Sequence, residues 1–232
     1  MLKKETLNLL NNDNIGFRNI FSICIGKTFL FQKRFINSLE KYNSWSTSVK
    51  EGILKLDDKI FNVEYIGTTG DDDPYWYSAE MEKVIPDQFT NLIVSSKKNM
   101  EVLNFSKLTE KQIFVVDFIN GYNLSMIYIA FAPLNVAYFC GSGNPSIYMF
   151  VKNLPDNIFE KIKPEEFATT IMSIISSFDV NHKLLVKALL IENDIDFVDN
   201  NDNIVAKFNE NSNFIVKFND KGLITNISGG LN

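Results

Sequence analysis

The sequence predicts an α+β fold in which an antiparallel β-meander is covered by a long N-terminal helix, with central helices and C-terminal β-strands. Three observations support this class. Between Trp45 and Met81, apolar residues alternate and are interrupted by short turn-forming runs, as in a β-meander. Over residues 17–42, apolar residues recur at intervals of three and four, the period of a helix that lies on a core. After residue 202, three short alternating stretches are separated by Asn-rich and Asp-Lys-Gly turns.

The remaining elements follow from the same two periodicities and from their start and stop signals. Proline and two glutamates at the start of residues 164–178 favour a helix, because an acidic first turn complements the helix dipole. Expected helices cover residues 2–11, 17–42, 86–103, 120–132, 164–178 and 181–192. Expected strands cover residues 53–56, 60–66, 75–77, 114–116, 136–140, 146–151, 204–208, 213–218 and 223–227. We expect one domain over residues 1–232, with 153–163 as the candidate point of subdivision.

Composition excludes several classes of protein. The formal net charge is −5, and arginine occurs only at Arg18 and Arg34, so the chain lacks the basic face that binds a phosphate backbone. We therefore expect no nucleic-acid partner. The apolar stretch 124–140 is short for a membrane span and contains Pro133, so we expect a buried helix and strand there and no membrane association.

Cysteine and histidine usage limits the chemistry. Cys24 and Cys140 lie in apolar contexts without metal-ligand spacing, which is typical of free thiols in a reducing cytoplasm. His182 is the only histidine, so no multi-histidine metal site can form, and we expect it to have a surface or capping role. Gly26-Lys27-Thr28 lacks the upstream glycine of a phosphate-binding loop. We expect no catalytic residue, metal or cofactor, and a cytoplasmic location.

One stretch is a positive candidate for a site. Residues 71–73 are three consecutive aspartates, which we call the acidic turn, and three aromatic residues follow at 75–77. Aromatic side chains beside concentrated charge are typical of protein–protein interfaces. The predicted partner-binding residues are Asp71, Asp72, Asp73, Tyr75, Trp76 and Tyr77. Because side chains alternate along a strand, either Trp76 or the Tyr75/Tyr77 pair should face the core.

The region around this stretch resembles a family of bacterial single-domain proteins of unknown function. The resemblance covers roughly residues 17–150 and is carried by a Gly-Thr pair and a Trp-x-Trp-like strand of a β-meander. The residues that carry it are Gln32, Trp45, Gly52-Ile53-Leu54, Ile66-Gly67-Thr68-Thr69 and Tyr75-Trp76-Tyr77. It implies a single α+β domain and carries no assigned activity.

We expect a non-enzymatic, cytoplasmic protein-binding domain, with a bacterial toxin as one candidate partner for which the chain would act as an immunity protein. Acidic proteins that neutralise basic nucleases present such charged surfaces. One alternative is a small-ligand-binding module with an apolar pocket between the helices of residues 17–42 and 86–103 and the sheet. Another is a carboxylate-based hydrolase that uses Glu64, Glu80 or Glu82. The sequence does not indicate the oligomeric state.

Overall fold

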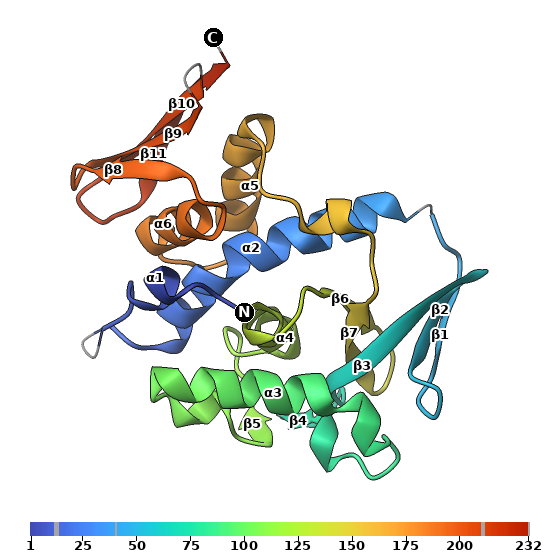
Figure 1. The fold of residues 1–232 in the computed structure, drawn as a ribbon. Helices are drawn as coiled ribbons and strands as arrows, with labels where there is room; N and C mark the ends of the chain where they lie inside the picture. The colour runs from blue at the N-terminus through green and yellow to red at the C-terminus, as the bar shows by residue number, and fades with distance from the viewer. Residues whose placement is uncertain (12–13, 40, 210–211, 232) are drawn as a thin grey trace. The chain divides into compact units, whose positions relative to one another are not determined.

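The computed structural model of the protein describes residues 1–11, 14–39, 41–209 and 212–231. It confirms the α+β class, with antiparallel sheets and a long N-terminal helix (Figure 1). The chain forms two compact units. The first unit comprises Met1 and Phe31–Phe159, and the second comprises Leu2–Leu30 and Glu160–Asn232. The division after Phe159 falls within the predicted segment 153–163, and a single folding domain stays a prediction.

The first unit is built on a seven-stranded antiparallel sheet around one long strand, β3. The early part of β3 pairs with β2 and its later part with β4, while β7 pairs along its other edge and carries β6. The strands are β1 Trp45–Ser48, β2 Ile53–Leu56, β3 Lys59–Thr69, β4 Tyr75–Ser78, β5 Gln112–Phe114, β6 Ala137–Gly141 and β7 Ser146–Lys152. The predicted meander is therefore confirmed, since the strands β1 to β5 are neighbours in the sheet in their order along the chain.

Helices cover this sheet with apolar faces. α4 (Gly121–Phe131) begins where Asn120 accepts a hydrogen bond from the Asn123 N–H, as a helix N-cap does, and nearly all of its residues are buried. α3 (Asn91–Met100) packs beside α4 and against β3 (Figure 1). The last turns of α2 (Phe17–Ser38) also belong to the first unit, and there Phe35 packs edge-on against Phe61 of β3.

The predicted helix over 86–103 is shorter in the structure. A 3₁₀ turn, η2 (Asp87–Phe89), precedes α3, and Thr90 between them leaves helical geometry with φ −121° and ψ 2°. The α-helix begins after it because a carboxylate oxygen of Glu64, distant in the sequence, accepts the N–H of Leu92 at 2.8 Å. The other 3₁₀ helices are η1 Ala79–Met81, η3 Glu101–Leu103, η4 Ser106–Leu108 and η5 Asp156–Phe159.

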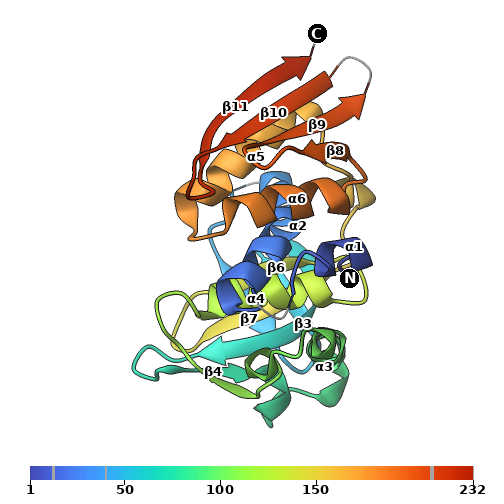
Figure 2. The same cartoon turned by 90° about the vertical axis from the view of Figure 1, so that its left-hand side faces the viewer.

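The second unit packs helices on one face of a four-stranded antiparallel sheet (Figure 2). The elements are α1 Lys4–Leu7, α5 Pro164–Ser177, α6 His182–Glu192, β8 Asp196–Asp199, β9 Asn203–Asn209, β10 Ser212–Phe218 and β11 Ile224–Leu231, together with the part of α2 up to Leu30. Phe167 of α5 contacts Phe208 and Phe214 of the sheet at the centre of an apolar core. The three predicted C-terminal strands are confirmed, and β8 is an additional strand at the sheet edge.

The predicted helix over residues 2–11 is reduced to the four residues of α1. So short a helix is marginal by itself, because helix nucleation is costly. Its position is fixed by tertiary contacts, since the Lys3 N–H and the Thr6 hydroxyl both donate to Glu192 at the end of α6. The local sequence therefore overstated the helix.

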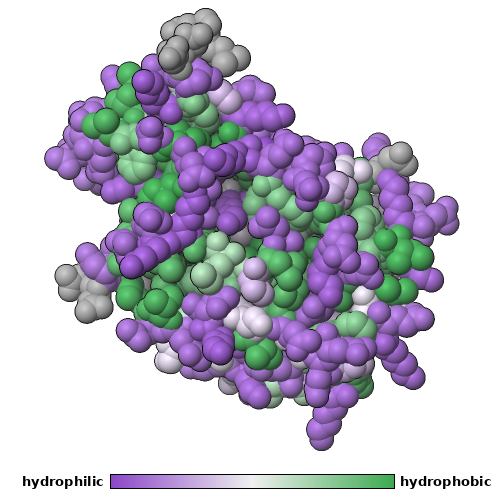
Figure 3. Space-filling view, viewed as in Figure 1, coloured by the Kyte–Doolittle hydropathy of each residue, from purple (hydrophilic) through white to green (hydrophobic). Residues whose placement is uncertain are grey.

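Hydrophilic side chains predominate on the face drawn in Figure 3, and hydrophobic side chains gather there in separate patches. Among the described residues, no helix is both long and apolar enough to cross a membrane. The apolar stretch 124–140 instead forms most of α4 and of β6, as the sequence predicted.

Candidate partner-binding site

Strand β4 sorts the predicted aromatic residues onto two sides of the sheet. Trp76 is completely buried, whereas Tyr75 and Tyr77 on either side of it are half-buried. This follows from the alternation of side chains along a strand. Trp76 therefore belongs to the core and cannot contact a partner, and the tyrosine pair remains at the surface.

The buried tryptophan gives the strand a rigid backing. Its ring stacks on Tyr128 of α4 with centroids 5.3 Å apart, and the Lys97 ammonium lies 5.8 Å from the ring centroid. Gly67 on the neighbouring strand makes room for the ring, because a Cβ there would lie 2.5 Å from it. The inner side of β4 is thus closely packed, which holds its outer side chains in place.

Lys97 of α3 is itself buried and fully bonded. Its ammonium donates to Glu80 at 2.7 Å, to the Ser78 hydroxyl at 2.9 Å and to the Glu110 carbonyl at 2.9 Å. Burial lowers the pKa of Lys97, and the Glu80 carboxylate opposes that shift. The lysine therefore ties α3 to the end of β4 and to the segment before β5.

The outer side of β4 and β5 forms an aromatic face, which we define as Tyr75, Tyr77 and Phe114. Tyr75 lies opposite Phe114 in the strand register, and their rings meet edge to face with centroids 5.5 Å apart. The Tyr75 and Tyr77 centroids lie 6.3 Å apart. Phe114 is 49% exposed. The sequence predicted a strand over residues 114–116, whereas the strand in the structure is Gln112–Phe114, so the prediction was correct only at Phe114. The sequence also gave no sign that this strand would complete a site.

The acidic turn lies directly before this face, and its three carboxylates differ in role. Asp73 accepts the Tyr75 N–H at 3.1 Å and the Tyr77 hydroxyl at 2.9 Å, so it orients the start of the strand. The hydrogen bond to Asp73 raises the pKa of Tyr77. Asp71 and Asp72 are exposed, and neither carboxylate has a side-chain partner among the described residues. These two are therefore the carboxylates available to a partner.

A hollow of about 540 Å³ opens beside the turn, and we call it the acidic hollow. Its lining comprises residues 69–74, Val115, Asn120, Gly121 and Tyr148. The Tyr148 hydroxyl lies 3.2 Å from the Thr69 hydroxyl, and Tyr148 can press against the start of α4 because Gly121 has no side chain. The hollow thus combines carboxylates with hydroxyl groups on a glycine-lined wall, which suits a cationic side chain.

The carboxylates considered for a hydrolase are each held by a separate partner. Glu64 is buried, and its two oxygens accept from the Lys152 ammonium and the Leu92 N–H, both at 2.8 Å. Glu80 binds Lys97, and Glu82 accepts the Thr68 hydroxyl at 3.0 Å. Residues 79–81 form a 3₁₀ helix directly after β4. A hydrolase stays a prediction for which these contacts provide no support.

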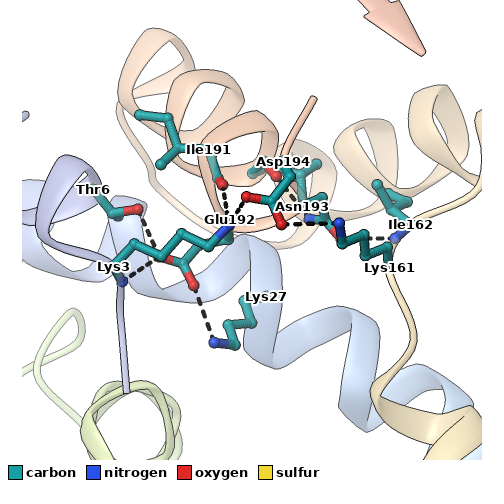
Figure 4. Close-up of polar contacts among 10 residues, drawn as sticks. Lys3, Thr6, Lys27, Lys161, Ile162, Ile191, Glu192, Asn193 and Asp194 are labelled. Carbon is teal, nitrogen blue, oxygen red and sulfur yellow. Dashed lines mark hydrogen bonds and ion pairs between the residues drawn. The ribbon is translucent and has the colours of Figure 1, made fainter. Parts of the chain in front are cut away.

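In the second unit, the Gly26-Lys27-Thr28 motif lies within α2 and serves packing. The Lys27 ammonium binds the Glu192 carboxylate at 3.0 Å, and the Glu192 side chain is only 1% exposed. Figure 4 shows that Thr6 and the main chain of Lys3 converge on the same carboxylate, at 2.6 and 2.7 Å. Glu192 therefore binds α1 and α2 to the end of α6, which is a structural role.

The same cluster continues through the two residues after Glu192 (Figure 4). Asn193 accepts the Ile162 N–H at 2.7 Å, and Asp194 binds the ammonium groups of Lys3 and Lys161. The hydrogen bond from Lys3 is the main cause that lowers the pKa of Asp194 to about 2. These contacts hold the chain that enters the second unit at Glu160 against the end of α6.

The comparisons with known proteins give no family. No family model matches the chain, and neither a curated protein nor a solved structure matches it. The resemblance to bacterial proteins of unknown function stays a prediction. In the part of the chain that the structure describes, no group of three or more His, Cys, Asp or Glu side chains is placed to hold a metal ion.

Proposed function

We propose that the chain is a protein-binding protein that captures a partner with a basic surface through its acidic hollow and aromatic face. This proposal rests on one observation: the acidic hollow and the aromatic face are next to each other. Asp71 and Asp72 line the hollow, Asp73 connects the turn to β4, and the outward tyrosines follow at once. A lysine or arginine of the partner would enter the hollow while its neighbouring side chains cover the aromatic rings.

The chemistry of these groups supports a protein partner. Tyrosine and other large aromatic residues contribute much of the affinity at interface centres, because they bury a large area and have few rotatable bonds. Carboxylates at the rim raise the rate of encounter with a basic protein and exclude acidic ones. The acidic hollow and the aromatic face together supply both elements.

The rigidity of the site also supports binding. Trp76 stacks on Tyr128 beneath the aromatic face, and Lys97 fixes α3 beneath the same strand. Side chains that are already ordered lose little conformational entropy when a partner covers them. This surface therefore needs little reorganisation to bind.

We propose further that this binding takes place in the cytoplasm and neutralises a toxin with a basic surface. Cys24 and Cys140 are both free thiols, as is usual in a reducing compartment. An inhibitor that blocks a basic toxin needs the surface described above and no catalytic residues.

The test compares variants of the intact chain against a partner isolated from the host cell and then purified. The double variant Asp71→Lys/Asp72→Lys should weaken binding at least about tenfold, since it reverses the charge of the hollow. Tyr75→Ala should weaken it by roughly tenfold or more, as expected for an aromatic hot spot. Calorimetric titration at two salt concentrations measures both effects, and affinity of the wild type should fall as salt rises.

The matched control is Glu51→Lys/Glu101→Lys, which changes the net charge equally at exposed carboxylates outside the hollow. It should bind as tightly as the wild type after correction for the general charge effect. If the control and the Asp71/Asp72 variant lose affinity equally, or if neither loses any, the proposed site is incorrect.

A further inference from the structure

A second cavity, in the second unit, has the opposite charge. It has a volume of about 330 Å³ and lies where α6 begins, beside the start of α2 and the turn between β10 and β11. We call it the basic pocket and define it by Arg18, His182, Lys183, Lys187 and Lys221. Among the described residues that line it, none is Asp or Glu. The chain as a whole has a net charge of −5, so this lining differs in charge from the average of the protein.

Arg18 is held in place but keeps donors free. Its Nε donates to Asp179 at 2.9 Å, and its Nη2 donates to the Val180 carbonyl at 2.9 Å. The second terminal nitrogen, Nη1, has no partner among the described residues. A guanidinium has five N–H donors in a fixed plane. The bonds of Nε and Nη2 therefore also fix the direction of the Nη1 donors.

The lysines of the pocket exceed their counter-ions. Lys183 and Lys187 share one carboxylate, Asp199, at 3.0 and 3.2 Å. The Lys221 ammonium, in the turn after β10, has no partner within the described ranges. The four cations of the lining, Arg18, Lys183, Lys187 and Lys221, therefore outnumber the two carboxylates that bind them, Asp179 and Asp199.

His182 adds a neutral donor. Its Nδ1 accepts the N–H of Ile224 at 3.1 Å, so the neutral ring carries its proton on Nε2. Burial, followed by the charge of Arg18, lowers the pKa of His182, whereas Asp179 opposes the shift. With its pKa below the ordinary value, the ring is mostly neutral at pH 7 and offers one N–H.

The lining is not polar throughout. Val180, Leu184 and Leu223 contribute apolar side chains to the same cavity. A ligand that complements the pocket would therefore carry a compact double negative charge on an apolar body. A phosphate monoester carries a charge near −2 at pH 7 and several strong acceptor oxygens, and the arginine fork matches its geometry.

We propose that the basic pocket binds a small phosphomonoester, with the phosphate between Arg18, Lys221 and His182 and the organic group against Val180, Leu184 and Leu223. This site is independent of the proposed protein-binding function, because all its residues belong to the second unit and the acidic hollow belongs to the first. A variant of one site therefore changes no residue that lines the other.

The single histidine permits a direct test on the full-length chain. Phenyl phosphate and inorganic phosphate are titrated at constant ionic strength while the NMR signals of the His182 ring are followed. We expect a saturable shift with both compounds, with tighter binding of phenyl phosphate. At saturation the pKa of His182 should rise, because a dianion near the ring favours its protonated form.

Lys221→Gln should weaken phenyl phosphate binding about three- to tenfold, because it removes one charge-assisted contact. Lys217→Gln is the matched control, since Lys217 is exposed on the neighbouring strand, carries the same charge and does not line the pocket. It should bind as the wild type does. Arg18→Lys should also weaken binding, because an ammonium cannot both hold Asp179 and present a second edge.

Several results would overturn the proposal. One is a linear shift that chloride reproduces at equal ionic strength, and another is an unchanged affinity in Lys221→Gln. A preference for phenylacetate over phenyl phosphate would exclude phosphate as the recognised group. Phosphatidylcholine vesicles with and without phosphatidic acid separate the two sources of a phosphomonoester: binding only to the phosphatidic acid vesicles, without binding of phenyl phosphate, would exclude a small soluble ligand.

Discussion

The acidic hollow of the first unit and the basic pocket of the second are cavities of similar kind with opposite charge. In the hollow, Asp71 and Asp72 are exposed and have no side-chain partner in the described part of the chain. In the pocket, Arg18, Lys183 and Lys187 are each paired with a carboxylate that lies outside the lining. The carboxylates of the acidic hollow are therefore free at an exposed turn, whereas three of the cations of the basic pocket are held by counter-ions outside its lining.

The presence of an acidic and a basic cavity in one chain shows that net charge says little about the charge of local surfaces. A net charge of −5 argues against an extended basic face, but it does not prevent a small group of cations from gathering around one cavity. The two sites also suit different ligands. Exposed carboxylates beside aromatic rings favour a large partner, whereas several cations around one small cavity favour a small anion.

The largest expected effect concerns the support of the acidic site. Trp76→Ala removes a fully buried ring that stacks on Tyr128, so it should lower the free energy of unfolding by about 3–5 kcal/mol. Tyr75→Ala, one residue away on the outer side, should cost less than about 1 kcal/mol. Chemical denaturation of both variants measures the contrast. Equal losses would show that the outer tyrosine is part of the core and would remove it from the binding surface.

A smaller effect is expected in the second unit, at the C-terminal end of α6. Glu192 closes the far end of α6 and accepts from Lys27, Thr6 and Lys3, so Glu192→Gln should lower the free energy of unfolding by roughly 1–3 kcal/mol. The exposed Glu5 of α1 provides the control, and Glu5→Gln should change stability by less than about 0.5 kcal/mol. Denaturant titrations compare the two. If Glu192→Gln left the free energy of unfolding unchanged, the charge of the Glu192 carboxylate would not stabilise the second unit.

The smallest effect is a pH dependence restricted to the second unit. The lowered pKa of His182 means that the unfolded chain binds a proton more readily than the folded one. This contribution to stability is present above about pH 6.5 and is lost as the pH falls through the folded-state pKa. Amide hydrogen exchange should show less protection of the second unit near pH 5 than near pH 7. His182→Asn should abolish this difference between the two pH values. The first unit contains no histidine, so an equal change there would contradict this origin.

Local sequence signals predicted most of the fold. The helix expected over residues 120–132, the helix opened by Pro164 and the alternation over residues 60–66 each correspond to elements at the expected places. The errors arose where distant residues decide. Glu64 determines where α3 begins, and Glu192 pins the short α1. Strand β8 (Asp196–Asp199) was missed because its two apolar residues, Phe197 and Val198, are adjacent and do not alternate with polar ones.

The candidate sites were less accessible from the sequence. The acidic turn and its aromatic residues are contiguous, so the pattern identified them, although only the structure assigns Trp76 to the interior. Phe114 and Tyr148 join that site through strand pairing. The basic pocket draws on residues 14–19, 180–187 and 221–223, and no local pattern unites segments so far apart.

The division of the chain has a consequence for biosynthesis. The first unit is complete, apart from Met1, within Phe31–Phe159, whereas the second needs both Leu2–Leu30 and Glu160–Asn232. During translation, Leu2–Leu30 is therefore synthesised long before Glu160–Asn232, the other part of the same unit. Domains otherwise tend to fold as units in order of synthesis. Throughout that interval the apolar side of residues 17–30 lacks its final neighbours, and a nascent chain halted near residue 160 would expose it to chaperones.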